Sequence, residues 1–295
     1  MKNNLLLILS LLFFSFQVRG ELSFKWSGIA GIYLTDGKTS LFFDPVFSRP
    51  HVIQFFIGLD YQVDEEMVKK ELNRLHISKL DAIFIGHTHF DHALDMHVVQ
   101  KQTNAIIHGS RTTKFISLAH GVPKDHIKLA KDKDIFTYGD FKIEVIESKH
   151  GLILGQFEFR GGEITKPLNH KPDLSDYKMG GSYSYYISHP DGDIFIQQAT
   201  RTTPRIQAEL KGKKLKALFQ GLANRKNSED LYKGIINHAT SIEKIIPIHH
   251  DNFFLDRNEK EMNLLWGVRL EEFLKYSKSK GQKIINPVYY KSYKL

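Results

Sequence analysis

The stretch that decides the fold is FIGHTHFDHALD at 84–95, in which an apolar strand leads directly into His87, His89, Asp91 and His92. In an extended chain His87 and His89 project to the same side, so two imidazoles can reach one cation. Asp91 and His92 follow at the next turn, where they can reach a second position. Burying side chains of this kind without partners is costly, and a solvated loop has no need of such density. The segment therefore predicts a metal site.

Cysteine is absent from the sequence, which excludes disulfides, thiolate nucleophiles, iron–sulfur clusters and cysteine-ligated zinc. Any metal must be held by histidine and carboxylate side chains. Of the 295 residues, 41% are hydrophobic and 25% are charged, which excludes disordered, collagenous and polytopic membrane proteins. The formal net charge is +8, but the longest basic stretch is the short KGKK at 211–214. We therefore expect no nucleic-acid partner.

Residues 1–20 have the layout of a secretory signal peptide. Lys2 precedes an almost unbroken apolar run, 5–16, and small or polar residues follow it up to Gly20. This run is short of the roughly twenty residues that cross a bilayer as a stable helix. We expect cleavage before Glu21 and export to the periplasm or the medium, with no stable transmembrane anchor afterwards. A retained membrane anchor is the alternative.

The rest of the chain, 21–295, shows no linker and is expected to form a single domain. It opens with three short apolar or alternating runs, FKWSG, GIYLT and SLFFDP, which predict strands joined by turns such as DGK at 36–38. Helical and strand patterns then alternate, which predicts mixed α/β layers. The predicted helices are 64–76, 92–101, 111–120, 204–211, 228–239 and 260–278, and the predicted strands are 81–86, 105–109, 141–148, 182–188, 193–198, 216–221 and 244–250.

One segment, 160–181, is polar, rich in glycine and poorly periodic. Segments of this kind form active-site flaps or plain surface insertions, and both interpretations stay open here.

HTHFDH at 87–92 matches in full the His-x-His-x-Asp-His signature of the metallo-β-lactamase fold superfamily, which the chain resembles. The stretch 24–50, which includes the Asp44-Pro45 step, is similar to the opening of one branch of that superfamily. This branch contains L-ascorbate-6-phosphate lactonase and the phospholipase D that hydrolyses N-acyl-phosphatidylethanolamine. The resemblance implies an α/β fold, a four-layer αββα sandwich of the metallo-β-lactamase type. It also implies a metal centre at one edge of the sandwich, between the two halves.

The resemblance supplies two more ligands. His150 in ESKHG follows a predicted strand and would complete a three-histidine site with His87 and His89. IIPIHHDNF supplies the last ligand, for which the register favours His249 over His250. The implied metal is zinc, as one or two ions, although histidine and carboxylate ligands also suit iron or manganese. We expect Asp44 to accept a hydrogen bond from a ligand histidine, because metal-bound imidazoles usually need an acceptor for their second nitrogen.

The sequence departs from the family at the aspartate that bridges two metals. In IFIQQATRT this aspartate aligns with Ala199, whose methyl group cannot bind a cation. The second site then keeps Asp91, His92 and His249. Gln198 is a weak substitute, because an amide is a poorer zinc ligand and a shift of one residue in a strand points to the opposite face. Asp251 is another weak candidate.

The ligand set predicts a metal-dependent hydrolase that uses a metal-bound hydroxide on an ester, lactone or phosphodiester. The substrate would be a small or lipid-like molecule. Asp91 is the expected catalytic residue, because it can orient the hydroxide and then carry its proton toward the leaving group. The alternative is a non-catalytic metal-binding or ligand-binding envelope protein, suggested by Ala199. Hydrolysis of β-lactams is less favoured, because the opening segment resembles the lactonase and phospholipase branch.

Overall fold

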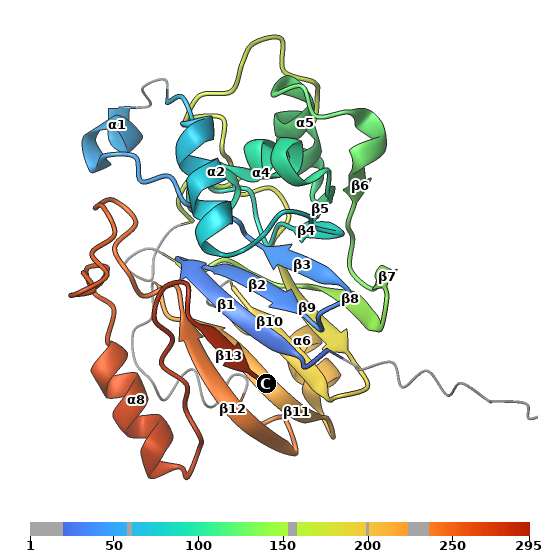
Figure 1. Cartoon of the computed structure of the whole chain (residues 1–295), viewed down its shortest axis with the longest axis vertical. Helices are drawn as coiled ribbons and strands as arrows, with labels where there is room; N and C mark the ends of the chain where they lie inside the picture. The colour runs from blue at the N-terminus through green and yellow to red at the C-terminus, as the bar shows by residue number, and fades with distance from the viewer. Residues whose placement is uncertain (1–19, 58–60, 153–157, 199–200, 224–235) are drawn as a thin grey trace, which may run out of the picture.

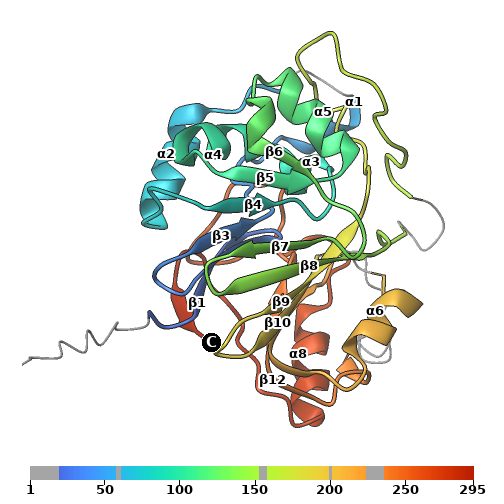
Figure 2. The same ribbon diagram turned by 90° about the vertical axis from the view of Figure 1, so that its right-hand side faces the viewer.

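The structure is a computed structural model that describes residues 20–57, 61–152, 158–198, 201–223 and 236–295. Two β-sheets pack face to face, as Figures 1 and 2 show. The first sheet has the strand order β13-β1-β2-β3-β4-β5-β6. Its strands are β1 Ser23–Gly28, β2 Gly31–Thr35, β3 Ser40–Phe43, β4 Ala82–Phe84, β5 Ile106–Gly109, β6 Ile127–Leu129 and β13 Ser292–Lys294.

The second sheet has the order β12-β11-β10-β9-β8-β7. Its strands are β7 Ile135–Tyr138, β8 Phe141–Glu147, β9 Tyr183–Ser188, β10 Asp193–Gln197, β11 Lys214–Gly221 and β12 Ser241–Ile248. The helices are α1 Val52–Ile57, α2 Glu65–Arg74, α3 Phe90–Ala93, α4 Met96–Thr103, α5 Arg111–Ala119, α6 Pro204–Leu210 and α8 Leu270–Ser279, with a 3-10 turn η1 at Lys124–His126.

Aromatic side chains fill the space between the sheets. The ring of Tyr185 on β9 lies 5.3 Å from that of Phe43 on β3 and 5.5 Å from that of Phe84 on β4. Phe24 and Phe219 make a further edge contact across the same layer at 4.8 Å. These rings are almost completely buried, and their burial is the main force that holds one sheet on the other.

Helices cover the outer face of each sheet. Helices α2, α4 and α5 bury Leu72, Val99 and Ile116 in one core with β4 and β5. On the opposite side, α6 and α8 pack Ile206 and Phe273 in a core with the second sheet (Figure 2). The molecule is therefore the four-layer αββα sandwich that the sequence predicted.

Most predicted elements are confirmed, and α2 begins as expected, with Asp64 accepting from the backbone N–H groups of Glu66 and Met67. The predicted helix 92–101 is wrong in one respect, because the chain forms two helices, α3 and α4, separated at Asp95. The buried Asp95 carboxylate accepts from the backbone N–H groups of Phe47 and Ser48 at 2.6 and 2.7 Å. It thus ties this break to the loop after β3.

The predicted helix 260–278 is wrong over its first half, since α8 begins only at Leu270. Upstream of it, Leu265 N–H donates to the His250 carbonyl at 2.9 Å, and Gly267 has a φ of +82°. The backbone therefore pairs with the segment after β12 instead of coiling. Strands β6, β7 and β13 and helix α1 were not predicted. Most of the predicted helix 228–239 lies outside the described residues.

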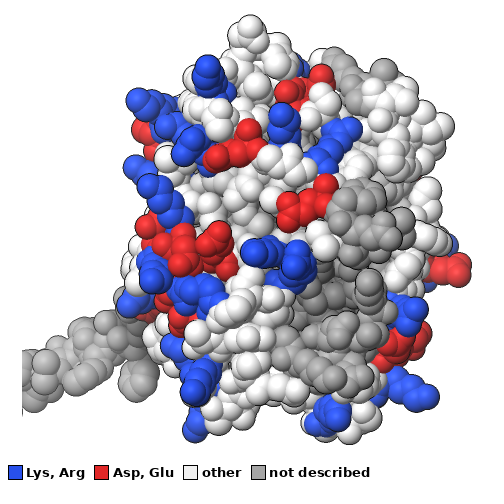
Figure 3. All heavy atoms as spheres, turned by 180° about the vertical axis from the view of Figure 1, so that it is seen from behind, with Lys and Arg blue, Asp and Glu red and all other residues white. Residues whose placement is uncertain are grey.

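The predicted signal peptide, 1–20, lies outside the described residues except for Gly20. Within the described ranges, no helix has the length and apolar character that crossing a membrane requires. Figure 3 shows Lys and Arg side chains interspersed with Asp and Glu on the face seen from behind. Export, the single domain and the lack of a nucleic-acid partner stay predictions.

Two stacked imidazoles in the outer helical layer predict a pH-dependent stability. His97 and His120 lie ring on ring at 3.7 Å, and burial lowers the pKa of His97 to about 3 and that of His120 to about 4. The unfolded chain regains the ordinary histidine pKa of 6.5. Above this pH both imidazoles are neutral in the folded and in the unfolded chain, so they do not make the free energy of unfolding depend on pH. As the pH falls from 6.5 toward 4, the unfolded state takes up the protons and the folded state loses stability.

His97→Phe keeps a stacked ring but removes one titrating group. We expect the unfolding free energy of the metal-free protein to fall less steeply below pH 6.5, by at most about 1.4 kcal/mol per pH unit. Urea titrations at several pH values measure this slope. His51→Phe is the control, because its ring faces solvent in the folded chain. Equal slopes for His97→Phe and the parent would contradict the prediction.

Candidate metal centre

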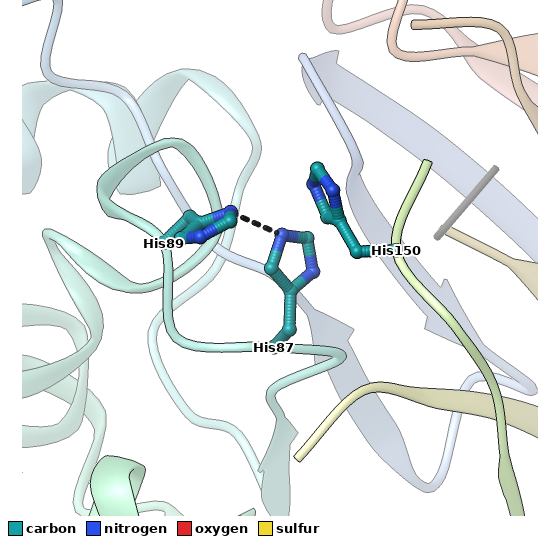
Figure 4. A group of neighbouring side chains, drawn as sticks. All are labelled: His87, His89 and His150. Carbon is teal, nitrogen blue, oxygen red and sulfur yellow. Dashed lines mark hydrogen bonds between the residues drawn. The ribbon is translucent and has the colours of Figure 1, made fainter. Parts of the chain in front are cut away.

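Three imidazoles converge where β4 and β8 end. His87 and His89 lie on the loop between β4 and α3, and His150 follows β8. Figure 4 shows the three rings pointing toward one another. One nitrogen from each lies within 4.8 Å of the others, and His87 Nε2 is 3.0 Å from His89 Nδ1. We call these residues the first histidine group.

A carboxylate and two imidazoles form a second group, which consists of Asp91, His92 and His249. Asp91 and His92 lie on α3, and His249 comes directly after β12. His249 Nε2 is 3.0 Å from His92 Nε2 and 3.3 Å from Asp91 Oδ2. The two groups adjoin, because the rings of His87 and His92 are 3.8 Å apart. The structure thus brings together all six predicted ligands at one edge of the sandwich.

The protonation states of the first histidine group and of Asp91 suit a cation. Burial lowers the pKa of His87 and His150 and lowers that of His89 to about 3, so these rings are neutral near pH 7. Burial alone would raise the pKa of Asp91, but the neighbouring His92 and His249 outweigh it and hold the pKa below its ordinary value. Neutral imidazoles with lone pairs and an ionised carboxylate are the donors that Zn²⁺, Fe²⁺ or Mn²⁺ requires. The residues present therefore fit a bound metal.

Hydrogen bonds orient two of the rings. His150 Nδ1 donates to the Gly151 carbonyl at 2.7 Å, which leaves its Nε2 as the acceptor. His92 Nδ1 donates to Asp44 Oδ2, while the other Asp44 oxygen accepts from Gly86 N–H at 2.7 Å. The structure therefore places Asp44 in the supporting position expected from the sequence. We call 86–89, the loop that begins the HTHFDH motif, the signature loop. The Asp44 carboxylate binds both His92 and the first residue of this loop, Gly86, and so fixes their relative positions.

The structure separates His249 from its two neighbours. His249 faces the second group, whereas the His250 ring stacks on Trp26 at 4.8 Å. Asp251, considered above as a weak ligand candidate, is used differently. Its carboxylate accepts from Ile29 N–H at 2.7 Å and from Tyr289 OH at 3.0 Å, and it pairs with Arg49 at 2.7 Å.

This use of Asp251 positions His249. The Ile29 carbonyl accepts from His249 N–H at 2.6 Å, and both residues have positive φ angles, +51° and +56°. Asp251 therefore holds the same peptide segment from the other side through Ile29 N–H. Arg49 and Asp251 therefore help to hold His249 in place, a role that the sequence did not predict. Nothing in the local pattern around Arg49 signals a partner 202 residues away.

The Gln198 side chain lies next to Gly86, the residue before His87. A Cβ atom at Gly86 would be 2.3 Å from Gln198 Oε1 and 3.2 Å from Asp44 Oδ2. Only glycine therefore leaves space for this amide next to the signature loop. Neither polar atom of the buried Gln198 side chain has a hydrogen-bond partner among the described residues. Ala199 itself lies outside the described residues, so the loss of the bridging carboxylate stays a prediction.

Aromatic rings line one side of the two groups. The Phe253 ring is 5.6 Å from that of His249, and the Phe159 ring is 6.4 Å from that of His89. Phe55 on α1 contacts Phe159 at 5.1 Å and continues the layer outward. Helix α1 then exposes Ile53, Phe56 and Ile57 to solvent. A layer of apolar side chains, largely buried, thus extends from α1 toward the centre.

The segment 160–181 packs on the signature loop. The Met179 carbonyl accepts from Thr88 N–H at 2.9 Å, and the segment buries Leu174 and Tyr177 in the core beneath the outer helices. Its interpretation as a flap stays a prediction.

Solved structures of low sequence identity share this fold. Igni18, a metallo hydrolase from the archaeon Ignicoccus hospitalis, is 14% identical, with 93% of this chain and 99% of that chain covered and a TM-score of 0.58. YhfI from Bacillus subtilis, a metallo-β-lactamase fold protein, is 14% identical, with coverage of 94% and 100% and a TM-score of 0.55. An isothiocyanate hydrolase from Delia radicum gut bacteria is 16% identical, with coverage of 92% and 98% and a TM-score of 0.58.

Neither protein-family models nor curated proteins match the sequence. The layers, the strand order and these similarities define the class: the chain has the metallo-β-lactamase fold. At the edge where the sheets meet it carries two adjoining groups of side chains that can hold metal ions.

Proposed function

We propose that the protein is a metal-dependent hydrolase. The observation that carries this proposal is the convergence of His87, His89 and His150 beside Asp91, His92 and His249, with the first three imidazoles held neutral by burial. A bound metal ion supplies Lewis acidity and lowers the pKa of a coordinated water toward neutrality. Zinc is the favoured ion, because three histidines with an open position suit it best.

Asp91 is the catalytic residue in this proposal. Its carboxylate is ionised at neutral pH and lies within the second group, 3.3 Å from His249 Nε2 and 3.7 Å from His92 Nε2. A carboxylate in this position can accept a proton from the attacking water and return it to the leaving group. Asp44 keeps the His92 ring oriented during these transfers.

The proposed substrates are esters, lactones or phosphodiesters of small or lipid-like molecules. The Phe159 and Phe253 rings beside the centre and the exposed apolar residues of α1 support a substrate with an apolar portion. The similarity of 24–50 to the lactonase and phospholipase branch favours the same substrates. We also propose that the protein acts outside the cytoplasm after removal of 1–20.

Metal analysis beside a substrate panel tests the proposal. Protein produced with zinc, manganese and iron is analysed by mass spectrometry and then assayed with an ester, a lactone, a phosphodiester and an isothiocyanate. We expect at least one equivalent of metal and turnover that a chelator removes. Fewer than about 0.1 equivalents of metal would contradict a metal-dependent activity, since structural and catalytic metals bind tightly.

Ala199→Asp separates the hydrolase from a non-catalytic binding protein. The family resemblance aligns the bridging aspartate with this position, so we expect the new carboxylate to raise the occupancy of a second ion by up to one equivalent. In a hydrolase that works with one metal, the parent already turns over its substrate and the variant changes the rate only modestly. Turnover that appears in Ala199→Asp alone would identify the parent as the non-catalytic protein. Ala199→Asn, of similar size but neutral, is the matched control.

A further inference from the structure

A separate cluster lies at the opposite end of both sheets. It consists of Asp36 on the β2–β3 turn, Asp140 on the β7–β8 turn and His189 directly after β9. The metal centre lies beyond the other end of β8, a strand that spans roughly 20 Å at about 3.3 Å per residue. The two turns touch each other, because a Cβ atom at Gly139 would lie 2.1 Å from Thr39 Oγ1.

The cluster combines two carboxylates and one imidazole. One ligand atom from each residue lies within 4.8 Å of the others. The His189 side chain is 0% exposed, and its Nε2 lies 3.6 Å from Asp36 Oδ2, which is too long for a hydrogen bond. This nitrogen has no hydrogen-bond partner among the described residues. A buried imidazole nitrogen therefore faces the Asp36 carboxylate at ion-pair distance without a hydrogen bond to it.

The carboxylate of Asp36 is already fixed. Its Oδ1 accepts from the backbone N–H groups of Lys38 and Thr39 at 2.9 and 2.7 Å, which leaves Oδ2 facing His189. Burial would raise the pKa of Asp36, but these N–H groups and His189 outweigh it and lower the pKa below its ordinary value. Asp36 therefore presents an ionised oxygen to the cluster at neutral pH.

The other ring nitrogen of His189, Nδ1, lies next to Asp191. Nδ1 lies 3.7 Å from Asp191 Oδ2 and accepts from Asp191 N–H at 3.1 Å. Metal-bound histidines usually donate their second N–H to a carboxylate. A cation on Nε2 requires the ring proton to move to Nδ1, where it displaces the Asp191 N–H and faces Asp191 Oδ2 at 3.7 Å. The Phe141 ring, 4.6 Å from the imidazole, keeps the ring in this orientation.

We propose that Asp36, Asp140 and His189 bind one divalent transition-metal ion, of the Mn²⁺ or Zn²⁺ type, at a structural site distinct from the catalytic centre. Two carboxylates and an imidazole, completed by water, form a donor set for such ions. Asp36 belongs to the first sheet, whereas Asp140 and His189 belong to the second. The ion ties the two sheets together at the end where the catalytic metals cannot do so.

Counting bound Mn²⁺ tests this site. The free ion gives an electron paramagnetic resonance signal that disappears on binding, so a titration yields the number and affinity of sites. The key variant is Asp140→Asn, because Asp140 is exposed and its replacement leaves the core unchanged. Asp125→Asn, at an exposed carboxylate on η1, is the matched control. We expect Asp140→Asn to lose one site or to weaken it by more than about 10-fold, and Asp125→Asn to match the parent.

The same titration in a His89→Ala background separates this site from the catalytic centre. We expect His89→Ala to keep a Mn²⁺ site that the double variant His89→Ala/Asp140→Asn loses. We also expect Mn²⁺ to raise the melting temperature of His89→Ala more than that of the double variant, because an ion that binds only the folded state stabilises it. Equal Mn²⁺ counts and equal shifts in the two proteins would overturn the proposal and leave an Asp36–His189 ion pair alone.

Discussion

His89→Ala is expected to abolish hydrolysis and to weaken metal binding at the first histidine group by more than about 100-fold. His89 supplies one of three converging imidazoles, and its Nδ1 lies 3.0 Å from His87 Nε2. With two ligands left, the site no longer closes around an ion. Dialysis against buffered zinc measures the affinity, and the substrate panel measures the rate.

His126→Ala is the matched control, because it removes a partly buried imidazole in the outer helical layer. We expect it to keep both the metal and the activity. A His89→Ala protein that retains parental metal content and turnover would contradict the proposed centre. Loss of folding is distinguished by the far-ultraviolet circular dichroism spectrum, which we expect to be the same for both variants and the parent.

Arg49→Met is expected to lower the unfolding free energy by about 3–5 kcal/mol, the usual cost of breaking a buried ion pair from one side. The Arg49 and Asp251 side chains are only 5% and 1% exposed, and their charged atoms are 2.7 Å apart. The variant leaves the Asp251 carboxylate buried without its cation. We also expect weaker metal binding by the second group, because Asp251 acts on His249 through Ile29.

Urea unfolding of the metal-free protein measures this loss. Arg49→Met/Asp251→Asn removes both charges, so we expect it to be more stable than Arg49→Met alone. The control is Lys101→Met, which breaks the exposed pair with Glu65, whose two side chains are 65% and 48% exposed. We expect a change there of no more than about 1 kcal/mol. Similar losses for Arg49→Met and Lys101→Met would contradict the supporting role of the buried pair.

The sequence predicted those parts of the site that are local. HTHFDH places four candidate ligands within one strand end and one short helix, so no long-range contact is needed to recognise them. His150 and His249 came from the family resemblance, because each follows its strand as an ordinary surface histidine would. The pair Arg49–Asp251 and the cluster around His189 could not be predicted, since each joins segments that only the folded chain brings together.

The fold was predictable where periodicity is strong. Helix α2 and strands β8 to β12 carry clear apolar patterns and appear where expected. The errors have local physical causes. Asp95 interrupts a continuous helical pattern by accepting two backbone N–H groups, and the chain before Leu270 pairs with the loop after β12. The missed strands β6 and β13 have three residues each, which is too few to show an alternation of apolar and polar residues.

Strand β13 is the edge strand of the first sheet and pairs with β1, with Ser23 opposite Lys294. During synthesis β1 leaves the ribosome long before its partner does. At about 5–20 residues per second the delay is on the order of tens of seconds. Throughout this time the backbone N–H and C=O groups along one edge of β1 are open to pairing with other chains. The strand also contains the large apolar residues Phe24 and Trp26. Nascent molecules thus have a prolonged opportunity to aggregate, and a holding chaperone that covers β1 during translation would suppress it.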